Sequence, residues 1–233
     1  MMVLSTKQLN MDIKRKAKEE FGFNLVCKSF TKIKKTDFVC TPFTLESYDS
    51  YAFTSANAVQ YFLENIDKKL LAEKNIFALQ GATRDELLLR NLVPRITAPN
   101  VNELGKLIKL NKAVLNIQKI LHPIGNLTLP DLRYVVTGSG MSYQDLTVYQ
   151  TELNPIPVDA IPFEAILFFS PSAIDSFSFA NRFSSERIYI CIGNTTFTRL
   201  QYYTDTYNAV IAKNPTPEAM LMALYKKMKY DKK

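Results

Sequence analysis

The sequence predicts an α/β fold in which parallel sheets carry helices on their faces, and three observations predict it. Strand-like and helix-like segments alternate along most of the chain. A serine ends an apolar run and begins a helix-compatible segment in residues 52–59, AFTSANAV, and again in residues 168–175, FFSPSAID. In both places the next strand ends in a Gly-x-Thr turn. We therefore interpret the chain as a duplicated strand-helix-strand-helix unit, which predicts two parallel sheets, each covered by helices.

The chain opens with a further unit of the same type. Residues 1–7, MMVLSTK, predict a short apolar strand, and residues 11–22, MDIKRKAKEEFG, predict a helix that ends at Gly22. A second strand is expected in residues 23–30, FNLVCKSF. The next segment, residues 35–43, KTDFVCTPF, is expected to be an extended connector outside the core.

After its serine, each copy continues with a helix, a strand with a glycine turn, a short strand and another helix. The serine-to-glycine distance differs by about three residues between the copies, so Gly81 and Gly193 are expected to be equivalent. Thr83 and Thr195 follow them at the same spacing. The successive segments are residues 59–71, 76–90 and 95–108 in the first copy, and residues 173–183, 188–201 and 209–224 in the second.

Residues 113–153 lie between the copies. They predict a strand, a turn at Gly125 and Asn126, a helix, a glycine stop and a long final strand. The end of this segment, residues 145–153, DLTVYQTEL, is expected to be a second extended connector.

Composition narrows the class of partner without naming it. The 233 residues are 47% hydrophobic and 22% charged, enough to bury a core. A net charge of +7 and a pI near 9.2 favour an anionic partner, which leaves nucleic acid, a membrane surface or an acidic metabolite open. The basic runs at residues 32–35 and 226–233 are expected to be solvated surface.

The cysteines and the one histidine exclude several kinds of site. Cys27, Cys40 and Cys191 are odd in number and widely spaced, which indicates free thiols in a reducing cytoplasm. No apolar run has the length of a membrane span, and no signal peptide is expected. With His122 as the only histidine and no phosphate-binding loop, neither a metal site, a histidine-based triad nor a nucleotide cofactor is expected.

The order and spacing of these motifs resemble the uroporphyrinogen-III synthase family, and the resemblance covers nearly the whole chain. FTSANAV and HPIGNLTLPDL carry it in the first half, and LTVYQTEL follows in the middle. FFSPSAIDSF, CIGNTTFTRL and KNPTPEAML carry it in the last third.

The resemblance implies two flavodoxin-like parallel-sheet domains joined by a two-stranded linker, with the active site in the cleft between them. One domain is then discontinuous, residues 1–38 and 152–233, and the other is inserted, residues 39–151. The linker strands would be residues 35–43 and 146–153. Where the family often has Thr-Arg-Pro after the first strand, this chain has Lys7 in place of the arginine.

The family's reaction, as the resemblance implies it, is the closure of hydroxymethylbilane without metal or organic cofactor. Loss of the terminal hydroxyl gives an azafulvene cation, and ring D is inverted before the macrocycle closes to uroporphyrinogen III. The substrate closes to the uninverted isomer on its own, so the enzyme must both assist water loss and block direct closure. The protein is expected to act as a monomer on this small molecule.

The site residues are expected where ligands bind in parallel α/β sheets, beyond the carboxyl ends of the strands, at helix N-termini that favour carboxylates. Tyr149, in a linker strand, is the expected catalytic proton donor. The expected substrate-binding residues are Lys7, Ser55, Ala56, Ala82, Thr83, Asn126, Ser170, Ser172, Asn194, Thr195 and Thr196.

Other interpretations stay open at this stage. Ser55 and Ser170 are also good N-caps, Thr83, Thr195 and Asn126 also suit turns, and a strand tyrosine is ordinary. A non-catalytic bilobal protein that closes on an anionic small molecule would share the fold and the charge. A nucleic-acid binder is disfavoured, because aromatic and basic residues do not alternate on one segment.

Overall fold

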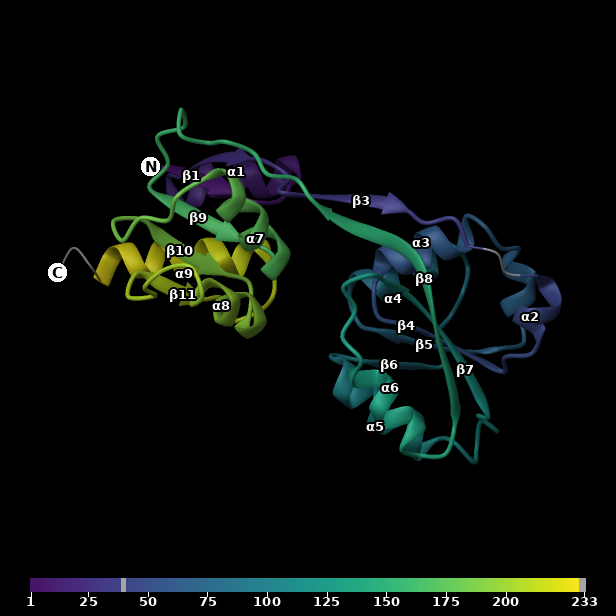
Figure 1. Cartoon of the computed structure of the whole chain (residues 1–233). Helices are drawn as coiled ribbons and strands as arrows, with labels where there is room; N and C mark the ends of the chain where they lie inside the picture. The colour runs from purple at the N-terminus through teal and green to yellow at the C-terminus, as the bar shows by residue number, and fades with distance from the viewer. Residues whose placement is uncertain (39–40, 231–233) are drawn as a thin grey trace. The chain divides into compact units, whose positions relative to one another are not determined.

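The computed structural model describes residues 1–38 and 41–230, which form two compact units (Figure 1). Unit 1 combines Met1–Lys32 with the chain from Glu152 onward, and unit 2 is Ile33–Thr151. Each unit has its own sheet and its own buried clusters on both faces of that sheet. The predicted α/β fold with two parallel sheets is therefore confirmed.

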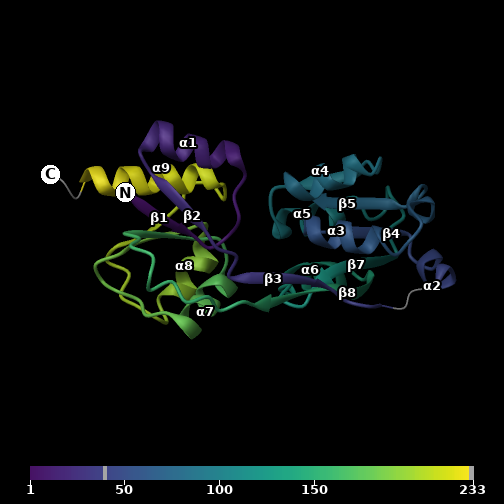
Figure 2. The ribbon, with the colours of Figure 1, turned by 90° about the horizontal axis from the view of Figure 1, so that it is seen from above.

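Unit 1 has a five-stranded sheet in the order β11-β10-β9-β1-β2, with neighbouring strands parallel. In chain order this is the 2-1-3-4-5 arrangement of flavodoxin-like folds. Figure 2 shows α1 and α9 on one face and α7 and α8 on the other. The strands are β1 (Met2–Ser5), β2 (Asn24–Cys27), β9 (Ala165–Phe168), β10 (Ile188–Cys191) and β11 (Ala209–Ile211), and the helices are α1 (Met11–Phe21), α7 (Pro171–Ala180), α8 (Asn194–Leu200) and α9 (Pro217–Tyr230).

Alternation along β1 explains the two-sided core of unit 1. Val3 and Leu4 are both fully buried, yet they belong to different clusters, because successive strand side chains face opposite ways. The following helix α1 is capped as the sequence predicts: the Asn10 side chain accepts from the Ile13 amide, and Gly22 takes the left-handed conformation at φ 71°. Strand β1 pairs with β9 in the sheet, so the residues that follow these two strands lie at the same edge.

Unit 2 has a six-stranded sheet in the order β3-β8-β7-β4-β5-β6, and the β8-β7-β4-β5-β6 neighbours are parallel. Helices α3 and α4 pack into one cluster, and α5 and α6 into another. The strands are β3 (Thr31–Lys35), β4 (Ser50–Phe53), β5 (Asn75–Leu79), β6 (Ile96–Ala98), β7 (Lys119–Gly125) and β8 (Ser142–Leu153), and the helices are α2 (Pro42–Glu46), α3 (Ala56–Leu63), the short 3₁₀ helix η1 (Lys68–Leu71), α4 (Ala82–Leu89), α5 (Val101–Leu110) and α6 (Asp131–Thr137).

Each sheet has one place where the chain order reverses. In unit 1 it lies between β1 and β9, and in unit 2 between β4 and β7. The connections from the two strands at such a point leave toward opposite faces of the sheet, which opens a crevice beyond their carboxyl ends. The residues that follow β1, β9, β4 and β7 are thus in the position where ligands of open α/β sheets bind.

The first connector strand lies earlier than predicted. The chain passes from unit 1 to unit 2 in β3, Thr31–Lys35, and returns in β8, whereas residues 35–43 are not one extended segment. Thr41 accepts from the Thr44 amide at 3.2 Å, and Pro42 occupies the first turn of α2, so the Thr-Pro pair starts a helix. Val39 and Cys40 of the predicted connector lie outside the described residues.

Candidate active site

The predicted site residues fall into two groups, one at the carboxyl end of each sheet. The structure brings the members of each group to one edge of one sheet, which is where the parallel fold leaves helix N-termini open. In unit 1, Lys7, Ser170, Ser172, Asn194, Thr195 and Thr196 follow β1, β9 and β10. In unit 2, Ser55, Ala56, Ala82, Thr83 and Asn126 follow β4, β5 and β7, and Tyr149 in β8 is in register with Gly125 at the end of β7.

The junction of β4 and α3 joins two predicted residues. The Ser55 Oγ and the Tyr149 hydroxyl are 3.1 Å apart, within hydrogen-bond distance. Ser55 occupies the N-cap position of α3 with extended backbone, but within the described chain its side chain makes no capping hydrogen bond. The amides of the first turn, beginning at Ala56, therefore keep no side-chain acceptor from the cap.

Tyr149 is seated firmly at this junction. Its side chain is 9% exposed, and its ring lies 6.0 Å from the ring of Tyr61 in α3. Gly125 makes room for it: a Cβ atom at this position would lie 2.6 Å from Cε2 and 2.8 Å from the hydroxyl of Tyr149. The glycine is thus required by the close approach of the tyrosine, and the phenol is held with its hydroxyl toward Ser55.

The corresponding junction of β9 and α7 is arranged differently. Ser170 accepts a hydrogen bond from the Ala173 amide at 3.1 Å and lies 3.0 Å from the Ser172 hydroxyl. This serine is an ordinary N-cap. At the neighbouring end of β1, the Thr6 hydroxyl donates to the Leu167 carbonyl at 2.9 Å, and the side chain of Lys7 is exposed.

The two glycine turns also differ. Gly81 has φ 74°, whereas Gly193 is extended at φ −171°. Thr83 is 6% exposed and Thr196 is 3% exposed, so these two threonines are alike in burial. Thr195, which sequence spacing pairs with Thr83, is exposed, as are Ala82 and Asn194. The spacing from the glycine does not predict which threonine is buried, because Gly81 and Gly193 differ in backbone conformation at the start of their helices.

Asn126 has a structural task at the end of β7. Its side-chain Oδ1 accepts from the backbone N–H of Thr151 at 2.8 Å, and its backbone N–H donates to the Tyr149 carbonyl at 3.3 Å. It therefore ties β7 to β8 on either side of Tyr149. The interpretation of Asn126 as a turn residue accounts for these contacts, and its side chain is exposed at the same edge.

Sequence reasoning missed the group next to Ser55. Thr54 Oγ1 lies 2.9 Å from His122 Nε2, and Asp145 Oδ1 lies 3.2 Å from His122 Nδ1. Burial alone would raise the pKa of Asp145, but hydrogen bonds from His122 and from Arg133 outweigh it and lower that pKa below its ordinary value. A triad of aspartate, histidine and hydroxyl was not expected from one histidine. Its members come from separate segments of the chain, and no local sequence pattern signals their pairing.

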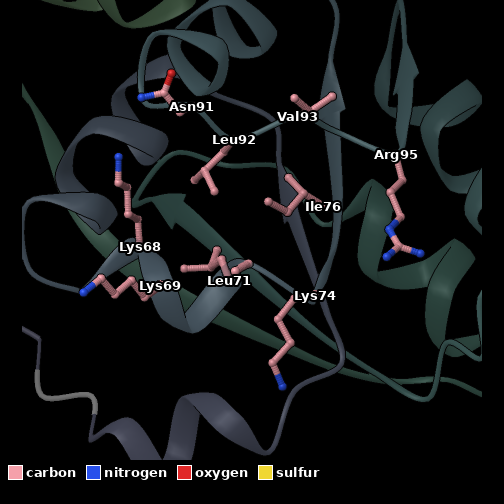
Figure 3. A pocket seen from close by; sticks show the side chains of 10 residues that line it. Lys68, Lys69, Leu71, Lys74, Ile76, Asn91, Leu92, Val93 and Arg95 are labelled. Carbon is pink, nitrogen blue, oxygen red and sulfur yellow. The ribbon is translucent and has the colours of Figure 1, made fainter.

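A surface pocket of about 440 Å³ lies elsewhere in unit 2 (Figure 3). Lys74 precedes β5 and Arg95 precedes β6, so this pocket is at the amino ends of the strands. Lys68 and Lys74 donate to the carbonyls of Arg90 and Glu46. None of the predicted site residues is among the described residues that line it, and the functional site is better sought at the opposite edge of the sheet.

Residues 1–38 and 41–230 contain neither a membrane-spanning helix nor a metal-binding cluster. In these ranges no helix is both long and apolar enough to cross a bilayer. The same ranges contain no cluster of three or more histidine, cysteine, aspartate or glutamate side chains that could hold a metal ion.

Comparisons with known proteins point to one family. The family model described as uroporphyrinogen-III synthase HemD matches residues 13–222. The crystal structure of uroporphyrinogen-III synthetase from Helicobacter pylori is similar, with 19% identity, a TM-score of 0.72 and coverage of 97% of this chain and 98% of that one. A mutant uroporphyrinogen III synthase from the extremely thermophilic bacterium Thermus thermophilus is similar at 13% identity and a TM-score of 0.66, with 99% of both chains covered. No curated protein matches.

Proposed function

The chain belongs to the uroporphyrinogen-III synthase family, and from this premise we propose that it closes hydroxymethylbilane with the groups at the carboxyl ends of its two sheets. The family consists of cyclising lyases of tetrapyrrole biosynthesis. The alternative, a bilobal binding protein without catalysis, is not favoured by this match.

The reaction makes two demands on the residues. A proton must reach the terminal hydroxyl of the substrate as it leaves, and the carboxylate side chains must be held so that direct closure is blocked. A linear tetrapyrrole with several acetate and propionate groups offers many carboxylates and few other polar groups for a protein to bind. Hydroxyls and open helix amides suit them, since an anion at a helix N-terminus gains about 0.3–1 kcal/mol from the dipole.

Tyr149 is proposed as the proton donor, and its contact with Ser55 is the observation that carries the assignment. The 3.1 Å distance lets the serine hydroxyl donate to the phenol oxygen while the phenol proton is given to the departing hydroxyl. A phenolate that develops in this step is then stabilised by a group that is already in place. The aromatic ring also offers apolar surface to a pyrrole.

Carboxylate binding is proposed at both sheet edges. In unit 2, Ser55, Ala56, Ala82 and Thr83 belong to helix N-termini, α3 and α4, that carry no side-chain cap among the described residues. In unit 1, the proposed binding residues are Lys7, Ser170, Ser172, Asn194, Thr195 and Thr196. Asn126 is proposed to bind through its exposed side chain while it holds the turn.

We further propose that the protein acts as a monomer in the cytoplasm, without a nucleic-acid partner. Cys27 and Cys191 are free thiols, which suits a reducing compartment, and burial raises the pKa of Cys191 to about 12. Sedimentation equilibrium at micromolar concentration tests the oligomeric state directly.

The decisive experiment is turnover. The purified protein is incubated with hydroxymethylbilane made enzymatically in the same reaction, and the type I and type III isomers are separated after oxidation. We expect the type III isomer to dominate. A product no richer in type III than the reaction without protein would refute catalysis, and saturable substrate binding in that same preparation would support the bilobal binding protein.

A further inference from the structure

A buried histidine lies directly behind the junction of β4 and α3, and the proposed site does not use it. His122 is 1% exposed and sits in β7, which has β4 on one side and β8 on the other. Its ring contacts Thr54, just beyond β4, and Asp145, in β8. The histidine therefore connects the strand that leads to Ser55 with the strand that carries Tyr149.

Hydrogen bonding assigns the proton on the imidazole. Arg133 donates to Asp145 Oδ2 from Nε at 3.1 Å and from Nη2 at 2.5 Å, so the carboxylate is ionised. An ionised carboxylate can only accept, which places the proton of His122 on Nδ1, the nitrogen that faces Asp145. The Tyr143 hydroxyl is hydrogen-bonded to the same nitrogen. Burial together with Asp145 raises the pKa of Tyr143, so it stays a neutral phenol; its proton goes to the ionised Asp145 carboxylate, and its oxygen accepts from Nδ1–H.

The other ring nitrogen then orients Thr54. An imidazole whose one proton is on Nδ1 has an acceptor at Nε2, and the Thr54 hydroxyl donates to it at 2.9 Å. Thr54 thus has one preferred side-chain direction. The imidazole of His122, to which Thr54 is bonded, is held in place, because the ring is buried and Asp145 contacts its other nitrogen.

Thr54 directly follows the last residue of β4, and the next residue, Ser55, has extended backbone. Side chains of consecutive extended residues point in opposite directions, so a fixed Thr54 side chain fixes the direction of Ser55. The contacts agree with this geometry, because Thr54 reaches β7 while Ser55 reaches Tyr149 in β8.

We propose that His122 is a positioning residue that, held by Asp145 and hydrogen-bonded to Thr54, fixes the Ser55 hydroxyl against Tyr149. The inference rests on the proposed function, in that Ser55 and Tyr149 must serve the reaction. His122 does not touch the substrate. Its task is to keep the β4–α3 junction in the one geometry in which phenol and serine are paired.

The first test removes only the Thr54 hydroxyl. Thr54→Val keeps the shape of the side chain, and Thr54→Ser keeps the hydroxyl. We expect Thr54→Val to lower kcat about two- to fivefold, no more than loss of the Ser55 hydroxyl itself, and to reduce the type III fraction, with KM within about twofold of wild type. Thr54→Ser is expected to restore most of both. Wild-type kcat and isomer ratio in Thr54→Val would overturn the inference.

The second test separates positioning from stability with a matched aspartate. Asp145 and Asp175 each bind one arginine, and both carboxyl side chains are 23% exposed. We expect Asp145→Asn and Asp175→Asn to lower Tm by similar amounts, whereas only Asp145→Asn lowers kcat and the type III fraction. Equal loss of kcat per molecule of folded protein in the two variants would refute a specific role for the histidine network.

The third test needs no substrate. Because His122 is the only histidine, a long-range ¹H–¹⁵N spectrum shows a single imidazole, and the two nitrogen shifts report which one carries a proton. We expect a proton on Nδ1 at neutral pH. An Nδ1 without a proton would contradict the hydrogen-bond assignment whatever the activity measurements give.

The outcomes also separate this inference from the proposed function. If wild-type protein produces no excess of type III, the proposed function fails and the ¹H–¹⁵N spectrum still decides the tautomer. If wild-type protein is active and Thr54→Val is equally active, only the positioning role of His122 fails.

Discussion

Ser55 and Ser170 begin helices at the same place in two copies of one strand-helix motif, yet their hydroxyls are used differently. Ser170 accepts from the Ala173 amide and caps α7 in the usual way. Ser55 has the same position and a similarly extended backbone, but its hydroxyl lies 3.1 Å from Tyr149 instead of capping α3. The hydroxyl partners differ as well, since Ser55 meets Tyr149 of β8, whereas Ser170 lies 3.0 Å from Ser172 of its own helix.

The comparison indicates a division of labour between the copies. Where the serine caps its own helix, the amides of the first turn are partly satisfied, and the serine stabilises the helix in addition to its proposed part in carboxylate binding. Where the serine turns to the tyrosine, the first turn of α3 keeps no side-chain cap, and the hydroxyl lies beside the proposed proton donor. Residues that match in a duplicated sequence are therefore not expected to match in function.

The largest expected effect concerns the tyrosine itself. Tyr149→Phe keeps the ring and removes the hydroxyl, so kcat should fall by about ten- to hundredfold as general-acid help is lost. The type III fraction should fall too, as spontaneous closure competes, while Tm stays nearly unchanged. Rates of type III formation against substrate concentration measure this. A variant with near wild-type kcat would return Tyr149 to a structural role and make the two junctions functionally alike.

Gly125→Ala tests whether the close packing of Tyr149 against Gly125 is needed for stability and turnover. The new methyl group would collide with the Tyr149 ring, so we expect a loss of about 1–3 kcal/mol in unfolding free energy and about tenfold in kcat. Gly193→Ala is the matched stability control, because a Cβ there meets no described atom within 4 Å and the backbone is extended. Urea unfolding of both variants gives the comparison. Equal stability of the two would mean that the tyrosine moves aside freely.

Alanine at the two serines should produce opposite signatures. Ser170→Ala removes a cap and should lower the free energy of unfolding by about 1 kcal/mol with a small change in kcat/KM. Ser55→Ala should leave stability nearly unchanged and lower kcat/KM about fivefold. Denaturant midpoints and steady-state kinetics on the same preparations test this crossover. Complete inactivation of folded Ser55→Ala would indicate that the serine itself reacts.

The smallest expected effect is on acid stability. Because the pKa of Asp145 is lower in the folded chain than in the unfolded one, its stabilisation is present above the ordinary aspartate pKa and is lost as pH falls through the lowered value. Asp145→Asn should therefore reduce Tm at neutral pH and give a flatter decline below about pH 5. Parallel Tm curves for variant and wild type would show that the carboxylate contributes nothing specific behind this junction.

Much of the fold could be predicted from local patterns. The helix at Met11–Phe21 has an asparagine cap and a glycine stop, and the buried strands Ala165–Phe168 and Ile188–Cys191 are continuous apolar runs. The first connector was misplaced because Thr31–Lys35 is short and strongly basic, so it lacked the apolar signal of a strand. The predicted domain boundary after residue 38 stays a prediction, although unit 2 begins at Ile33.

The site could be predicted only as far as strand ends. Parallel strands all end at one edge of their sheet, so Ser55, Ser170 and Asn194 could be located without coordinates. The His122 network joins residues from three separate segments, and its signal is a register between β7 and β8, which pairs His122 with Asp145. No local sequence pattern encodes that pairing, because the register of two strands depends on the packing of the whole sheet.

The order of the unit 1 sheet also sets an order for folding during synthesis. Thr6 donates to the carbonyl of Leu167, 161 residues further along the chain, so β1 cannot find its neighbour β9 until most of the protein has left the ribosome. At about 5–20 residues per second the first strand waits about 10–30 s, while all the strands of unit 2 emerge in between. The edge of β1 that pairs with β9 thus stays unpaired for this interval, and it is where we expect a holding chaperone to bind.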